Sequence, residues 1–427
     1  MKGTLLKRLL PGIAGQTLRA LKHRNFRLFF FGQLTSLVGS WMQSLAQGWL
    51  VWRLTHSAWL LGLVGFFQMI PVLFVGLLGG VAADRFDRHK IVIATQTAAL
   101  IQSVALAALT LAGHITVWEI LFLAAVLGLV NAFDMPARQA FLVQMVGKED
   151  LGNAIALNSS IFNGARIVGP AIAGFVVSRW GEGACFAINA VTFLAVLASL
   201  FAMKLEKSAI VRPPGGTWQR LQEGFAYSWG TPHVRALLAL VTVTSLSAIP
   251  YIVFLPALAG GVLNRDAAGL GILMTFSGIG ALSGALVIAH REGIRGLGRL
   301  TGHMAMAFGA ALVAFGCSTS FPLSCAALAL VGFFMMCQMA ATNTLLQSLV
   351  PEELRGRLMS LYVITFVGVT PVGSLIMGRV SQGVGVQAAI MGGGTVTLAA
   401  GLAFRLSVPR IRQAVLPLLP NEPRGMV

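Results

Sequence analysis

Long apolar runs separated by short, positively charged loops constrain this 427-residue chain more than any other feature. A helix needs about 20 apolar residues to cross a bilayer, and twelve segments meet that requirement. Unpaired backbone groups are too costly in hydrocarbon for open strands, so each segment is predicted to be a helix. The sequence therefore predicts an all-α integral membrane protein with spans at 28–52, 57–82, 91–112, 117–136, 154–178, 184–203, 236–262, 268–289, 300–317, 322–346, 358–379 and 386–404.

The composition agrees with this class. Apolar residues make up 56% of the chain and charged residues only 11%, against about 25% charged residues in an average soluble domain. So few charges cannot cover a soluble protein of this size, which excludes a cytosolic enzyme and a disordered chain. The four cysteines lie in apolar runs without metal-ligand spacing, so neither a disulfide scaffold nor a metal site is predicted.

The positive charges predict an orientation. With the N-terminus placed inside, 26 of the 31 Lys and Arg residues fall in the two terminal segments and the inner loops. Four fall outside, namely Arg53, Arg179, Arg265 and Arg379, and Arg166 lies within a span. This bias predicts that both termini are cytoplasmic. It also accounts for the net charge of +17 without a nucleic-acid partner, because the basic residues are scattered through short loops. Residues 1–27 are too long and too charged for a cleaved signal.

The longest loop, 204–235, divides the spans into two sets of six. It contains the linker-like run Arg212-Pro213-Pro214-Gly215-Gly216. Its second part carries aromatic and apolar residues at helical spacing, which predicts a short amphipathic helix on the inner membrane face: Trp218, Leu221, Phe225 and Trp229, beside Arg220 and Glu223. The predicted domains are an N-terminal six-helix bundle with a basic arm (1–203), a cytoplasmic linker (204–235) and a C-terminal six-helix bundle with a cytoplasmic tail (236–427).

The two halves resemble each other. Leu142-Val143-Gln144 recurs 203 residues later as Leu345-Leu346-Gln347, and an acidic turn follows each copy. Both copies fall between an even and an odd span on the inner side. This arrangement predicts parallel repeats related by an axis along the membrane normal, as in the two halves of major facilitators.

The loop between the second and third spans carries a motif. Residues 80–90 read Gly-Val-Ala-Ala-Asp-Arg-Phe-Asp-Arg-His-Lys, which resembles the helix 2–3 motif of the major facilitator superfamily, G-x-x-x-D-R/K-x-G-R-R/K. Asp87 replaces the second glycine and His89 replaces a base. The resemblance implies a latch that controls conformational change, formed by Gly80, Asp84, Arg85, Arg88 and Lys90 together with Arg138. A solvated basic loop that only sets orientation is the alternative.

The fifth span supplies a second match. Gly169, Pro170 and Gly174 resemble the G-P-x-x-G-G motif of antiporter branches, with Ala173 in place of one glycine. Small residues there would let another helix approach closely. The longer run from Phe133 to Arg166 resembles the drug-efflux and siderophore-export branch typified by the enterobactin exporter. The resemblance covers nearly the whole chain and is strongest over residues 26–200.

This resemblance implies a secondary active transporter of the bacterial inner membrane. Such a protein would export small amphipathic molecules, drugs or siderophores, by alternating access coupled to proton antiport. The expected partners are a small-molecule substrate, protons and the lipid bilayer, and a monomer is expected. No Walker loop, H-E-x-x-H or G-x-S-x-G motif occurs, so neither enzyme activity nor a cofactor is expected. A dedicated siderophore exporter is the alternative, as is a transport-inactive sensor or assembly partner on the same fold.

Arg166 is the one Lys or Arg residue in the interior of a predicted span, since Arg379 stands at the outer end of its span. An unpaired cation there costs about 2.5–3.5 kcal/mol, so it must face the bundle interior or a wet cavity. Ser159, Asn163, Arg166 and Pro170 share one helical face. Three roles are open for Arg166: contact with an anionic substrate, a gating ion pair, or bracing of two helices through backbone carbonyls.

Two acids are candidates for proton coupling, Asp134 near the inner end of the fourth span and Glu119 at its outer end. A carboxyl group can load and release protons there if desolvation raises its pKa. Asp134 is placed to pair with Arg138 four residues later, and the short loop to the fifth span would also let it meet Arg166. The family resemblance alternatively pairs Arg138 with Asp84.

Polar side chains within the spans predict a mostly apolar substrate cavity with few polar points. The first span carries a polar stripe that should face protein or a pathway rather than lipid. The cavity candidates are Gln43, Gln47, Asn163, Arg166, Tyr251, Gln338, Asn343 and Tyr362.

Overall fold

The computed structural model describes residues 18–147, 149–204, 217–291 and 293–415, without the side chains of 217–221, 353 and 410–415. The Arg212–Gly216 run, residues 1–17 of the basic arm and residues 416–427 of the tail lie outside the described residues, as do the side chains of Trp218, Arg220 and Leu221.

The first half consists of a short 3-10 helix, η1 (Arg19–Lys22), and five long helices. These are α2 (Arg24–Thr55), α3 (Ala58–Arg85), α4 (Arg88–Leu111), α5 (Val117–Val146) and α6 (Leu151–Phe201). Polar caps begin several of them. The side chain of Ser57 accepts a hydrogen bond from the amide of Leu60 before α3, and Asp87 accepts one from His89 before α4.

The linker helix α7 (Thr217–Gly230) leads into the second half, in which two spans are interrupted. One span runs through α8 (Pro232–Ser247), the 3-10 helix η2 (Ile249–Phe254), α9 (Leu255–Ala257) and the π-helix η3 (Leu258–Val262). The other runs through α13 (Glu352–Val363), the π-helix η4 (Ile364–Gly368) and α14 (Val369–Val384). The remaining helices are α10 (Ala267–Ala289), α11 (Leu297–Cys317), α12 (Phe321–Leu349) and α15 (Val386–Val415).

The described helices agree with the twelve predicted spans. Ten of them are long and apolar enough to cross a membrane. One of these, α6, contains two spans, because Gly181 breaks the helix at φ 80° and ψ 173°, between the predicted spans 154–178 and 184–203. The first predicted span is α2, which falls short of the ten because its glutamines and serines, among them the buried Gln33, Ser36, Gln43 and Gln47, lower its hydropathy. The described residues contain no strand.

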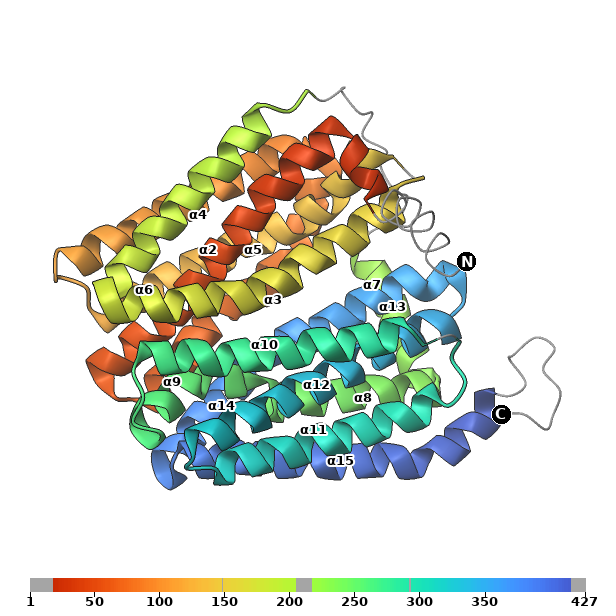
Figure 1. Cartoon of the computed structure of the whole chain (residues 1–427). Coiled ribbons are helices and arrows are strands. Elements are labelled where there is room, and N and C mark those ends of the chain that lie inside the picture. Colours follow the sequence, from red (N-terminus) through yellow and green to blue (C-terminus); the bar gives the residue numbers. More distant parts are fainter. Residues whose placement is uncertain (1–17, 148, 205–216, 292, 416–427) are drawn as a thin grey trace, which may run out of the picture.

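The two halves lie side by side as separate bundles (Figure 1, red to yellow-green and green to blue). Their apolar core is shared at one end only. There, a single cluster joins side chains of both halves, such as Phe186 and Phe254. Toward the other end each half has a core of its own, one around Phe141 and one around Leu345. The halves are therefore packed together at one end and separate at the other.

We call the end with the separate cores the basic end. The turns there follow α3, α10 and α12 and carry Arg85, Arg88, Lys90, Arg291, Arg295 and Arg355. The other end, where α2 finishes at Thr55 and α6 breaks at Gly181, is called the far end. This distribution of charge follows the predicted bias.

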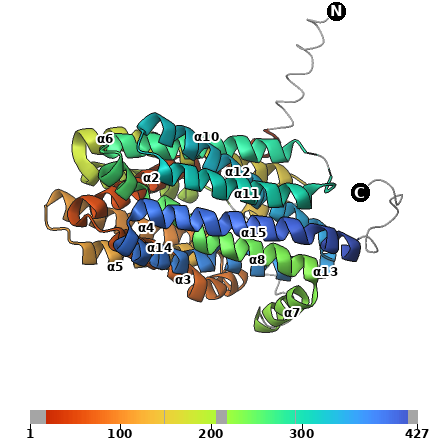
Figure 2. The same ribbon diagram turned by 90° about the horizontal axis from the view of Figure 1, so that it is seen from below.

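The segment that precedes each half docks on the basic end of that half. In the first half, His23 and Arg19 pair with Asp150, which lies directly before α6. In the second half, α7 extends beside α13 (Figure 2), and its Glu223 pairs with Arg357. The predicted amphipathic helix is thus present, and it packs on the protein at Glu223 and Gly224 while Phe225 and Trp229 stay exposed.

Candidate functional site

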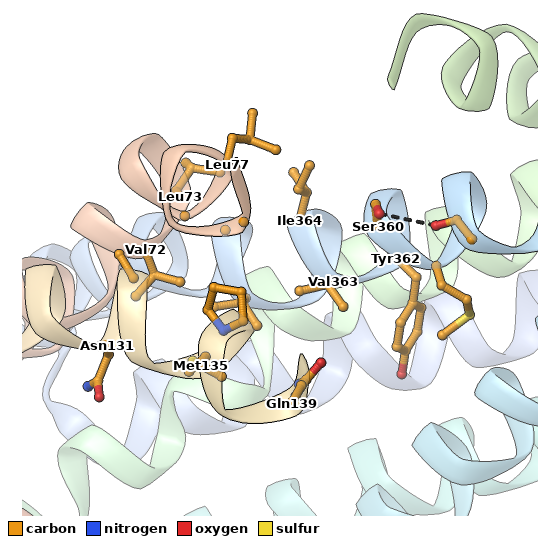
Figure 3. A pocket seen from close by; sticks show the side chains of 18 of the residues that line it. Val72, Leu73, Leu77, Asn131, Met135, Gln139, Ser360, Tyr362, Val363 and Ile364 are labelled. Atoms are coloured by element: carbon orange, nitrogen blue, oxygen red, sulfur yellow. Dashed lines mark hydrogen bonds between the residues drawn. The ribbon is translucent and has the colours of Figure 1, made fainter. Parts of the chain in front are cut away.

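A cavity of about 1100 Å³ separates the two halves toward the basic end. One wall consists of α3 and α5, and the other of α12, α13 and η4. Figure 3 shows side chains from both walls, with Leu73 and Leu77 on α3 and Val363 and Ile364 across from them. A volume of this size is slightly above the range of pockets that hold drug-sized ligands, about 300–1,000 Å³.

The cavity wall is mainly apolar, with a few polar groups from both halves. The apolar part includes Val72, Leu73, Leu77, Met135, Val363 and Val367. The polar part consists of Asp84, Asn131, Gln139, Asn343, Arg357, Ser360 and Tyr362. Such a surface suits an amphipathic ligand, because the apolar wall supplies burial and the few polar groups fix orientation.

Two glycine contacts seal the far end between α3 and α14 and between α6 and α10. A Cβ atom on Gly62 of α3 would lie 2.6 Å from the carbonyl oxygen of Ser374 on α14. A Cβ atom on Gly174 of α6 would lie 3.1 Å from the Cα atom of Gly271 on α10. Only glycine permits such close backbone approach. The structure is therefore closed at the far end and open at the basic end.

Four of the predicted site residues lie in the cavity wall, namely Gly80, Asp84, Asn343 and Tyr362. Among them, Asn343 accepts a hydrogen bond from Gln347 at 2.9 Å, and Asp84 has no ion pair within the described part of the chain. The motif residues Arg85 and Lys90 are exposed, and Arg88 donates to the carbonyl oxygens of Ala83 and Ala140 at 3.1 and 3.4 Å.

Gln43 does not line the cavity, contrary to the prediction. Its side-chain oxygen accepts hydrogen bonds from Ser103 and Asn189 at 2.9 and 2.8 Å, and its nitrogen donates to Gln102 at 3.0 Å. All three partners belong to α4 and α6 of the same half. The polar stripe of α2 therefore faces the inside of its own bundle at Gln43, because helical spacing identifies a buried face without identifying the partner helix.

Asn163 and Gln338 also lie outside the cavity wall. The amide of Asn163 donates to the carbonyl oxygen of Ser159 on its own helix at 2.9 Å. Gln338 on α12 is buried, and its side-chain oxygen has no hydrogen-bond partner among the described residues.

A second, small cavity of about 70 Å³ lies between α2, α3, α10 and the interrupted span of η2 and α9. Gln47, another predicted residue, lines it together with Ser44 and Gln68. The side-chain nitrogen of Gln47 is buried and has no partner among the described residues. The wall is otherwise apolar, and these three side chains are the polar groups that could hold a water molecule there.

Arg166 lies midway along the first part of α6, at the interface between the halves. Its guanidinium carbon is 6.0 Å from the ring centre of Trp41 on α2, and it is within electrostatic reach of Tyr251 on η2. The hydroxyl group of Tyr251 is 2.8 Å from that of Ser277 on α10. Terminal nitrogen Nη2 of Arg166 is buried and forms no hydrogen bond within the described residues.

Asp134 is buried and bonded within the first half. It accepts hydrogen bonds from Thr95 and Gln96 of α4 at 2.8 and 2.9 Å, and it forms an ion pair with Arg138. Of the partners that the sequence left open, the structure thus joins Arg138 to Asp134, and it joins neither Asp84 to Arg138 nor Asp134 to Arg166.

Glu119 has a structural role. Its carboxylate accepts a hydrogen bond from the amide of Thr116, and the side chain of Thr116 caps the same helix end, which together form a capping box at the start of α5. The fifth-span motif packs on two neighbours. Gly169 faces Trp41 of α2, while Pro170 and Gly174 face Gly271 of α10.

The sequence analysis missed Gln139, Arg357 and Ser360 as cavity residues. The sequence did contain an indication of Gln139, because Asn131, Met135 and Gln139 are spaced four residues apart and therefore share one face of α5. The spacing does not tell which helix that face meets.

The transmembrane secretion effector family matches the chain over residues 15–422. The staphyloferrin A transporter of Staphylococcus aureus is 25% identical over 82% of this chain and 88% of its own length. The multidrug efflux pump Tap of Mycolicibacterium fortuitum is 24% identical over 92% and 98%. The enterobactin exporter of Shigella flexneri is 27% identical over 83% and 85%.

A crystal structure of the peptide transporter POT superposes on 91% of this chain and 95% of its own, with a TM-score of 0.73 and 13% sequence identity. At that identity the likeness shows the shared fold, two bundles of membrane-spanning helices.

Proposed function

The chain belongs to the transmembrane secretion effector family of major facilitator transporters, and from that membership we propose that it exports small amphipathic molecules. The proposed setting is the bacterial inner membrane, with the basic end and both termini on the cytoplasmic side. The proposed units are the N-terminal bundle (1–203), the linker (204–235) and the C-terminal bundle (236–427), acting as a monomer.

The cavity of about 1100 Å³, open at the basic end and sealed at the far end, carries this proposal. Substrate would enter from the cytoplasm between α3 and α13. The bundles would then rock, closing the cavity at the basic end and separating the glycine contacts at the far end. Glycine contacts suit this motion, because flat backbone surfaces meet and part without interdigitated side chains.

Asp134 is the proposed coupling residue, and Glu119 is set aside as a helix cap. Asp134 is buried, and its sequence neighbours Ala132, Met135 and Pro136 line the cavity, so protons would reach it from the cavity past this part of α5. Protonation would weaken its ion pair with Arg138. The latch motif would act at the cavity mouth, where Asp84 faces the same space as Arg357.

The relatives support two substrate classes, since one is named as a multidrug pump and two as siderophore transporters. The test uses purified protein in vesicles that contain a pH-sensitive dye. Amphipathic drugs and catecholate or hydroxamate siderophores are added one at a time. We expect proton movement that depends on substrate, its loss in Asp134→Asn, and its retention in Glu119→Gln.

Substrate flux without proton movement would overturn proton antiport and leave the proposed export function standing. Flux of siderophores alone would favour a dedicated siderophore exporter. Tight binding without flux of any compound would instead favour a sensor. The melting temperature of each variant in detergent controls for misfolding.

A further inference from the structure

The interface between the halves contains a cation without a protein counter-ion. Nη2 of Arg166 is buried without a hydrogen bond in the described structure. Asp84, at the basic end of α3, has no ion pair among the described residues, and three other acids within or between the spans of the first half have partners of their own. Asp134 pairs with Arg138, Glu119 with Thr116, and Glu182 with Arg53. A desolvated guanidinium with no carboxylate is costly, and the cost falls when an anion binds.

The surroundings of Arg166 have the features of a recognition site. The face of Trp41 lies beside the guanidinium, and the hydroxyl pair of Tyr251 and Ser277 comes from the other half. Tyr251 belongs to the 3-10 helix η2, which precedes a π-helix in the same span. Interrupted membrane helices near the middle of the bilayer mark ligand sites in many transporters.

The walls of the two cavities do not include Arg166, and the open end is the side from which a ligand would reach it. Arg166 lies where α6 and α10 meet, with its carbonyl oxygen 3.2 Å from a Cβ atom built on Gly278. From there to the far end the two helices stay in contact through Gly174 and Gly271. Toward the basic end the same face of α6 carries Asn163 and the exposed Ser159.

We propose that Arg166, over the ring of Trp41 and at the interface that also holds the Tyr251–Ser277 hydroxyl pair, binds an anionic group of the substrate, so that the protein selects carboxylate-bearing amphipaths over cations. This inference rests on the proposed function, since it names the substrate class of the same transporter. The guanidinium forms charge-assisted hydrogen bonds to the anion. A cationic compound at the same place would be repelled.

The test measures binding of three probes that share one fluorophore: dansyl-β-alanine, its methyl ester and dansyl-cadaverine. The full-length protein is held in lipid nanodiscs, and energy transfer from tryptophan to dansyl reports binding. We expect the carboxylate probe to bind about tenfold or more tightly than the ester and the amine. Arg166→Gln should reduce this preference to less than about twofold, and Arg166→Lys should keep part of it.

Arg179→Gln is the matched control, because it removes the same charge from the exposed far end of the same helix. It should leave the preference unchanged. Melting temperatures identify any variant that fails to fold, and Arg166→Lys, which keeps the charge, then serves as the informative variant.

Equal binding of the three probes, tighter binding of the amine, no saturable binding of the carboxylate probe, or an unchanged preference in Arg166→Gln would each overturn the inference. These readouts are independent of flux. An anion preference without transport of any compound would overturn the proposed export function and leave this inference standing. Export of cations without an anion preference would overturn this inference and leave the proposed export function standing.

Discussion

Nε2 of His23 lies 2.7 Å from Oδ2 of Asp150, which joins the segment before α2 to the turn before α6. Arg19 pairs with the other oxygen of the same carboxylate. The hydrogen bond from His23, and after it the contacts of Arg19, hold the pKa of Asp150 below its ordinary value of 3.8.

A pKa that is lower in the folded protein stabilises the fold above the ordinary value, and the contribution is lost as pH falls through the folded value. We therefore expect Asp150→Asn to lower the melting temperature at pH 7, and the difference from wild type to persist down to about pH 4. Below about pH 4 the difference in melting temperature should shrink, because the protonated wild-type carboxyl group is then neutral, as the Asn side chain is.

Glu149→Gln is the control for Asp150. It removes a charge one residue away, where only the backbone carbonyl group contacts Arg19. Equal losses of melting temperature in Glu149→Gln and Asp150→Asn would show that the effect reflects net charge rather than this contact.

The glycine contact between α6 and α10 should determine which end is closed. Gly174→Val would place its side chain against the carbonyl oxygen of Ala267, 2.9 Å from where a Cβ atom begins. Overpacking of this kind costs about 1–3 kcal/mol, so the conformation that is closed at the far end should become less populated. Spin labels at positions 179 and 265 should then report longer distances in a background without Cys317.

Gly164→Val offers a matched control on the same helix, because nothing lies within 4 Å of its built Cβ atom. The distribution of distances between the two spin labels in Gly164→Val should match that of the labelled protein without the substitution. A similar shift in both variants would mean that valine perturbs α6 generally and that the seal is not responsible.

Gln43 should matter for stability and Asn343 for substrate. Gln43→Leu removes the bonds of Gln43 to three buried partners on α4 and α6. Ser103 still has the carbonyl oxygen of Phe186 as an acceptor, and each group left unsatisfied costs about 1–3 kcal/mol. A clear fall in melting temperature with unchanged apparent substrate affinity is expected. Asn343→Leu should show the opposite pattern, because Asn343 lies in the cavity wall. Altered substrate affinity in Gln43→Leu at unchanged stability would contradict this assignment.

The ion pair of Arg53 and Glu182 should stabilise the far end. Nε and Nη2 of Arg53 lie 2.7 and 3.2 Å from the two oxygens of Glu182. The Glu182 side chain is 7% exposed and that of Arg53 53%. Arg53→Ala should cost about 1.5–3 kcal/mol, near the lower value because the guanidinium is half exposed. Thermal unfolding of Arg53→Ala, Glu182→Gln and the double variant gives the coupling energy. Additive losses would show that no coupling exists.

Particular residues show where prediction from sequence succeeded. Gly181 interrupts α6 between two predicted spans, because the chain must turn between two apolar runs and glycine can adopt the positive φ of that turn. The family assignment also followed from local motifs, and the family match over residues 15–422 confirms it.

Other residues show where prediction failed or left alternatives. Asp134 and Gln43 both lie on polar helix faces, and their partners turned out to be within the first half. Gln139 and Arg357 received no cavity role, although both line the cavity wall. Each of these outcomes depends on which helices become neighbours across tens or hundreds of residues.

The sequence by itself therefore determined the number and placement of the membrane-spanning helices, the helical class and the bias of positive charge. These properties follow from rules that act along the chain, because hydrocarbon requires about 20 apolar residues per crossing and backbone bonds satisfied within the segment. Only the tertiary structure decided that the far end is sealed, that the cavity opens at the basic end, and that Arg166 lacks a counter-ion in the described structure. Those facts depend on the packing of one helix on another, which helical periodicity limits to a face but does not assign to a partner.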